Sequence, residues 1–133
     1  MNLEEKSTAE LQMLDSRHYL HPFTDPKALL EKGARVITRA DGIYLWDSDG
    51  EKILDAMAGL WCVNVGYGRE VLSRIAYEQS QELPYYNSFF KTTHPPAIAL
   101  AKKLIEITPE GFNQVFYTNS GSEANDTVMR TVR

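Results

Sequence analysis

The sequence has one cysteine, no long hydrophobic run and no excess of basic residues, and each absence excludes a class of protein. A single cysteine cannot form an internal disulfide, so a reducing, cytoplasmic setting is expected. Polar or paired basic residues interrupt the apolar stretches around 53–65 and 97–107, and neither stretch can span a bilayer. The acidic N-terminus lacks the basic-then-apolar order of a secretion signal. A formal net charge of −4 offers no basic surface to nucleic acid.

The glycine motifs that bind nucleotides are also missing. Neither G-x-x-x-x-G-K-[ST] nor G-x-G-x-x-G occurs, and Gly66 and Gly68 follow no apolar strand. A phosphate bound by this chain would therefore not belong to a nucleotide held by a P-loop or a Rossmann fingerprint.

Residues 1–68 carry the signals of an N-terminal segment with helices and a small sheet. A capping box at 7–10 starts the first helix, and Asp25-Pro26 opens a second, short helix that Gly33 closes. Asp-Gly turns then separate three short β-type runs, which predict an antiparallel meander. These runs cover residues 35–39, 43–46 and 52–55.

Residues 69–133 follow a helical pattern that suggests the start of a large α/β domain with a largely parallel sheet. The predicted elements are a helix over 69–83, an aromatic loop over 84–94, a helix from Pro95, a buried strand over Val115–Tyr117 and a helix from near Ser122. One strand cannot make a sheet, and the last helix has no C-terminal signal. Both features indicate the first part of a longer protein.

The turn before the last helix has the composition of an anion site. The first backbone N–H groups of a helix have no internal partner, and the helix dipole is positive there. A phosphate suits both, with Gly121 allowing close approach and the hydroxyls of Ser120 and Ser122 as donors. The same residues also fit a plain helix cap ending at Glu123, and the local sequence alone favours that cap.

Three stretches together resemble a known family. They read L-D-A-M-A-G-L-W-C-V-N-V-G-Y-G-R-E (54–70), Y-Y-N-S-F-F-K-T-T-H-P-P (85–96) and T-N-S-G-S-E-A-N-D-T (118–127). They resemble the class III (ω-)aminotransferases, pyridoxal-phosphate enzymes of fold type I, and most closely their amine–pyruvate and polyamine–pyruvate branch. The similarity runs from about His21 to Arg133.

The resemblance implies a cofactor, a pocket and a partner. Pyridoxal 5'-phosphate would place its phosphate on Ser120, Gly121 and Ser122. Leu60 and Trp61 resemble the wall of the substrate pocket, Phe23 its entrance, and Phe89 a residue that reaches into the other subunit of a homodimer. Without the resemblance, Trp61 and Phe89 would be taken for core aromatics. The substrates implied are an amine donor and a keto acid, pyruvate in this branch.

The residues that do the chemistry in this family are expected beyond Arg133. Pyridoxal catalysis needs a Schiff-base lysine and a carboxylate on the ring nitrogen, and no lysine here has the family's context. No catalytic residue is therefore assigned, and His18 and His21 lack a third metal ligand. The chain alone is expected to be inactive. Open alternatives are an ornithine or γ-aminobutyrate transaminase, an aminomutase, or an inert fragment.

Overall fold

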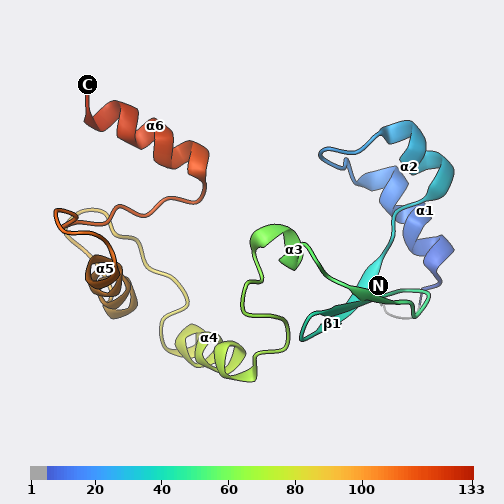
Figure 1. Ribbon diagram of the computed structural model, residues 1–133, viewed down its shortest axis with the longest axis horizontal. Helices are drawn as coiled ribbons and strands as arrows, with labels where there is room; N and C mark the ends of the chain where they lie inside the picture. The colour runs from blue at the N-terminus through green and yellow to red at the C-terminus, as the bar shows by residue number, and fades with distance from the viewer. Residues whose placement is uncertain (1–5) are drawn as a thin grey trace. The chain divides into compact units, whose positions relative to one another are not determined.

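The computed structural model describes residues 6–133 and divides the chain into two compact units (Figure 1). The units are Met1–Tyr77 and Glu78–Arg133. The boundary after residue 68 that the sequence suggests stays a prediction for the whole protein. Within residues 6–133, no helix combines the length and the apolar character needed to cross a membrane.

The first unit begins with the two helices that the sequence predicts. Ser7 caps α1 (Thr8–His18), and both hydrogen bonds of the capping box with Glu10 are present, which confirms the prediction. Asp25 caps α2 (Pro26–Lys32) by accepting a hydrogen bond from the Lys27 amide. Gly33 ends α2 with a φ of 72°, a conformation that glycine adopts without strain.

Three strands form the predicted antiparallel meander. They are β1 (Ile37–Asp41), β2 (Tyr44–Asp47) and β3 (Lys52–Leu54), in the order β1-β2-β3. Asp47, 7% exposed, closes the second turn by accepting hydrogen bonds from the amides of Asp49 and Glu51. The turn residues in the sequence were therefore sufficient to predict the meander, because each turn is determined by residues next to one another in the chain.

The start of α1 is attached to the turn between β2 and β3. The Thr8 hydroxyl lies 2.8 Å from Ser48 Oγ and 2.6 Å from Asp49 Oδ1. Further along α1, Gln12 donates a hydrogen bond to the Ala34 carbonyl at 2.9 Å. These side-chain contacts attach α1 to the sheet turn and to the residue after Gly33 inside the first unit.

The remaining helices lie where the helical periodicity puts them. α4 (Glu70–Glu82) and α5 (Pro95–Ile107) flank the aromatic loop, and α6 (Gly121–Thr131) follows the small-residue turn. A further short element, α3 (Ala58–Trp61), lies in a segment that the sequence suggested was only a connection.

The predicted strand Val115–Tyr117 is wrong for the described chain. These residues form no strand, and the Phe116 side chain is 76% exposed. A strand needs a neighbour for its backbone N–H and C=O groups, and no other segment of residues 6–133 pairs with this one. The only sheet in the described part of the chain is the antiparallel meander, so the parallel sheet stays a prediction for the whole protein.

Apolar burial contributes little to the described residues. None of their hydrophobic side chains is buried, and many large ones on α4, α5 and the loops are exposed. Caps, turns and side-chain hydrogen bonds therefore hold the local structure, since the usual driving force of apolar burial is not realised between these elements.

Candidate cofactor and substrate site

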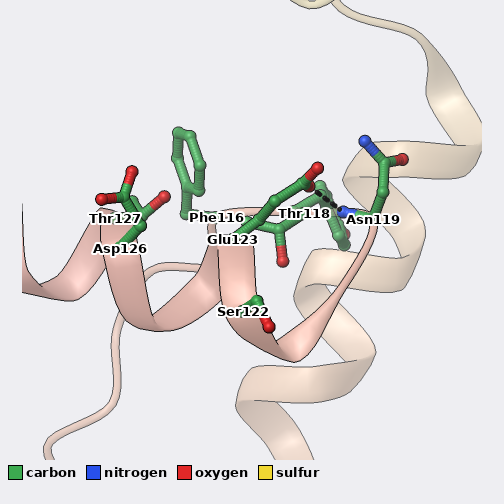
Figure 2. Close-up of a pocket in the computed structure, with 8 residues that line it drawn as sticks. Phe116, Thr118, Asn119, Ser122, Glu123, Asp126 and Thr127 are labelled. Carbon is green, nitrogen blue, oxygen red and sulfur yellow. Dashed lines mark hydrogen bonds between the residues drawn. The ribbon is translucent and has the colours of Figure 1, made fainter.

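The small-residue turn before α6 is a capped helix start. Ser120 is the N-cap in an extended conformation (φ −152°, ψ 160°), and its Oγ accepts a hydrogen bond from the Glu123 amide at 3.2 Å. The Glu123 carboxylate turns back and accepts from the Asn119 amide at 2.9 Å, which Figure 2 shows as a dashed line. The cap that the sequence favours locally is thus confirmed, although Glu123 reaches Asn119 rather than Ser120.

This cap leaves donors available at the helix start. The amides of Gly121 and Ser122 have no acceptor among residues 6–133, because the cap engages those of Asn119 and Glu123 instead. An added Cβ at Gly121 would meet nothing within 4 Å, so the backbone is open to a ligand there. The Ser120 hydroxyl accepts a hydrogen bond but keeps its own hydrogen to donate.

A pocket of about 470 Å³ lies beside this turn. Its lining residues are Phe116, Tyr117, Thr118, Asn119, Ser122, Glu123, Asp126 and Thr127. Figure 2 shows the Ser122 side chain and the Glu123 carboxylate leaving α6 on different sides. Of the two carboxylates in the lining, that of Glu123 is held by the Asn119 amide. The open amides of Gly121 and Ser122, with the Ser122 hydroxyl, form a donor set of the kind that binds phosphate.

The residues of the substrate-pocket prediction lie in exposed segments. Trp61 is 82% and Phe89 72% exposed, so neither packs into a core of the described residues. Leu60 adjoins Trp61 in α3, whereas Phe23 lies in the loop between α1 and α2. All four are exposed, as are many other large hydrophobic side chains of the described residues.

The short element α3 is one turn of left-handed helix. Its four residues have positive φ, namely Ala58 (47°), Gly59 (59°), Leu60 (63°) and Trp61 (66°). The turn is closed by the Trp61 amide on the Met57 carbonyl and the Cys62 amide on the Ala58 carbonyl, both at 2.9 Å. Positive φ costs about 1–2 kcal/mol for each residue other than glycine. Three such residues among four (Ala58, Leu60 and Trp61) mark a strained segment, and strain of this kind is common at binding sites.

Sequence reasoning missed this turn and the side chain that organises it. Asp55 accepts from the amides of Met57 (3.1 Å) and Gly59 (2.8 Å), and also from the Tyr67 hydroxyl (2.7 Å). An aspartate four residues before a glycine is a signal for a local turn. Nothing in that signal indicates left-handed residues as large as leucine and tryptophan.

The bond between Asp55 and Tyr67 shifts both pKa values. The Tyr67 hydroxyl, and then the amide of Gly59, lower the pKa of Asp55 below 3.8, against desolvation. Asp55 in turn raises the pKa of Tyr67 above 10.0, helped by partial desolvation. The stabilisation from Asp55 is complete above pH 3.8 and is lost as the pH falls through its lowered pKa. That from Tyr67 is complete below pH 10.0 and is lost as the pH rises through its raised pKa.

Asp55→Asn is therefore expected to lower the pKa of Tyr67, because the substitution removes the negative charge that disfavours tyrosinate. An NMR titration of the Tyr67 ring, compared between the natural chain and the variant, measures the shift. A Tyr67 titration that is identical in both proteins would contradict the hydrogen bond.

Known proteins are similar to this chain over most of its length. The model of the family "Aminotransferase class-III" matches residues 30–133. A putrescine–pyruvate aminotransferase of Pseudomonas aeruginosa is 64% identical over 126 residues, which make up 95% of this chain and 28% of that protein. The chain thus spans a little over a quarter of that relative.

Solved structures agree with the sequence comparison. An omega transaminase of Pseudomonas jessenii in complex with PMP superimposes with a TM-score of 0.88 at 43% identity, covering 92% of this chain and 27% of that one. A thermostable omega transaminase variant engineered for the synthesis of bulky amines gives the same TM-score, identity and coverage.

Proposed function

Because this chain belongs to the class III aminotransferases, we propose that it is the N-terminal portion of a transaminase that moves an amino group from an amine to pyruvate. The 64% identity to a putrescine–pyruvate aminotransferase carries this proposal. Family membership confirms the resemblance found in the sequence and the α/β fold of type I. It also indicates pyridoxal 5'-phosphate as the cofactor.

The helix start at α6 holds the phosphate of this cofactor in our proposal. The amides of Gly121 and Ser122 and the hydroxyl of Ser122 donate to phosphate oxygens, and the hydroxyl of Ser120 lies next to them. When bound, pyridoxal phosphate supplies an electron sink for the carbon that loses its proton. The role of this chain is to orient that group, since the lysine that would move the proton is expected beyond Arg133.

The pocket for the amine is formed by Trp61 and Leu60 as a wall, Phe23 at the entrance and Phe89 from the partner subunit of a homodimer. One observation supports the roles of Trp61 and Phe89. The engineered relative carries changes at a tryptophan and a phenylalanine with the same separation in sequence as Trp61 and Phe89, and it was engineered for bulky amines. An aromatic lining suits an amine with an apolar or long chain better than one with an α-carboxylate.

Putrescine-like diamines and other polyamines, ω-amino acids and aryl-alkyl amines are the donor classes that we propose. A cytoplasmic setting is part of the proposal and rests on the single cysteine. The alternative of an ornithine or γ-aminobutyrate transaminase differs in the donor expected, which makes the donor profile the discriminating observation.

The full-length protein is expected to form alanine from pyruvate with a diamine as donor. Residues 1–133 alone are expected to form none, because no lysine among them has the context of the family's Schiff-base lysine. Alanine production in an assay with putrescine, an ω-amino acid and an aryl-alkyl amine measures this. Activity with 2-oxoglutarate but not with pyruvate would contradict the proposal.

A further inference from the structure

The segment from Asp55 to Tyr67 is a loop whose two ends meet on one turn of the sheet. The Asp55 amide donates to the Ile43 carbonyl at 2.9 Å. Tyr67 and Gly42 exchange two backbone hydrogen bonds, at 2.8 and 3.2 Å. A compact loop with joined ends is an Ω-type loop, and such loops are frequently functional. Both ends are therefore anchored to the turn between β1 and β2.

The Asp55 carboxylate joins the anchored ends to the left-handed turn. One oxygen accepts from the Met57 amide, and the other accepts from the Gly59 amide and from the Tyr67 hydroxyl. The carboxylate thus connects the far end of the loop, through Tyr67, with the first half of α3. An added Cβ at Gly59 would also lie 3.0 Å from the Tyr67 hydroxyl, so this glycine allows the close approach.

The strained residues of α3 need such support, because nothing in their own preferences favours positive φ. Leu60 and Trp61 have φ values of 63° and 66°, and their side chains are exposed. Relaxing them to an ordinary backbone conformation would redirect both side chains. The direction in which Trp61 points therefore depends on the hydrogen bonds that hold the turn.

We propose that Asp55 and Tyr67 are positioning residues for amine specificity, which they exert by holding the left-handed turn that presents Leu60 and Trp61. The inference rests on the proposed function, in which these two side chains form the pocket wall. Asp55 supplies the acceptors and Tyr67 supplies the donor that orients the carboxylate. Neither residue needs to touch the substrate or the cofactor.

The test uses the full-length protein with its cofactor and the substitution Tyr67→Phe, which removes one hydroxyl. The kcat/KM for a long or aryl-alkyl amine is expected to fall about five-fold, as for the loss of one hydrogen bond, while the KM for pyruvate and the cofactor content stay unchanged. Hydrogen exchange of the peptide over 55–67 is expected to rise. Tyr44→Phe is the matched control, since its ring lies on the same sheet under Lys52 and its hydroxyl donates no hydrogen bond to the described residues.

A second set of variants separates positioning from general stability. On a Trp61→Ala background, Tyr67→Phe is expected to cause no additional change in amine preference, because the side chain that it positions is gone. Asp55→Asn is expected to reproduce the effect of Tyr67→Phe, and Asp55→Glu to recover part of it. If Tyr67→Phe lowers kcat/KM for the amine equally in the natural protein and on the Trp61→Ala background, the inference is overturned. It is also overturned if Tyr67→Phe lowers the melting temperature and leaves the amine profile unchanged.

Failure of the proposed function gives a different result. If Trp61→Ala alone leaves the amine profile unchanged, the pocket assignment is wrong. If Trp61→Ala changes the profile while Tyr67→Phe and Asp55→Asn change neither the profile nor the exchange of the loop, the positioning role is wrong and the pocket stands.

Discussion

The paired substitution Gly121→Val and Ser122→Ala is expected to weaken cofactor binding by about a hundred-fold in the full-length protein. The valine side chain would occupy the open space in front of the Gly121 backbone, where nothing else lies within 4 Å of an added Cβ. The alanine removes the Ser122 hydroxyl. Each charge-assisted hydrogen bond to a phosphate is worth about 1.5–3 kcal/mol, so losing one and obstructing the amides gives this magnitude.

Single substitutions show whether the loss arises at the ligand or in the helix. Gly121→Ala meets no neighbour among the described residues, and φ at this position is not positive, so α6 is expected to form at least as well. Its methyl group is still expected to reduce cofactor retention. Ser16→Ala on α1, whose hydroxyl donates to the Met13 carbonyl, is the matched control for a lost hydroxyl. Unchanged absorbance of the bound cofactor after dialysis of the double variant would refute the phosphate site.

The elements that sequence reasoning predicted correctly are those determined by neighbouring residues. Ser7 with Glu10, Asp25 with Pro26, and the Asp-Gly turns each specify a cap or hairpin within a few positions. The strand over Val115–Tyr117 failed because its hydrogen bonds depend on segments remote in sequence. An apolar run indicates burial, but only a neighbouring strand makes it part of a sheet.

The candidate site also has a part that the local sequence predicts and a part that it does not. Ser120 was predictable as a helix cap from local sequence, whereas the phosphate site that we propose at Gly121 and Ser122 rests mainly on the family resemblance. The left-handed turn was not predictable, because leucine and tryptophan avoid positive φ and no residue preference indicates them there. Asp55 and Tyr67 supply the explanation, since a carboxylate and a hydroxyl twelve residues away together stabilise what the local chain disfavours.

Trp61→Ala is expected to change the amine preference of the full-length protein by about ten-fold or more. In our proposal the indole forms the pocket wall, and the loss of an aromatic contact of this size is worth at least about 1–3 kcal/mol to a bulky apolar donor. A long or aryl-alkyl amine should lose kcat/KM, and a donor previously excluded by the ring should gain it. The ratio of kcat/KM between such donors, with pyruvate in excess, is the measurement.

Two companion variants determine what the change means. Trp46→Ala alters the other tryptophan, which stacks under Arg39 at 3.5 Å in β2, and it is expected to leave the donor ratio unchanged. Trp61→Gly removes the ring and also the strain, because glycine adopts a φ of 66° freely. If the loss of the indole ring alone determines the amine preference, Trp61→Ala and Trp61→Gly will have the same donor profile. The two variants will then differ only in stability. An identical profile in Trp61→Ala and the natural protein would instead make Trp61 a residue of the loop and not of the pocket.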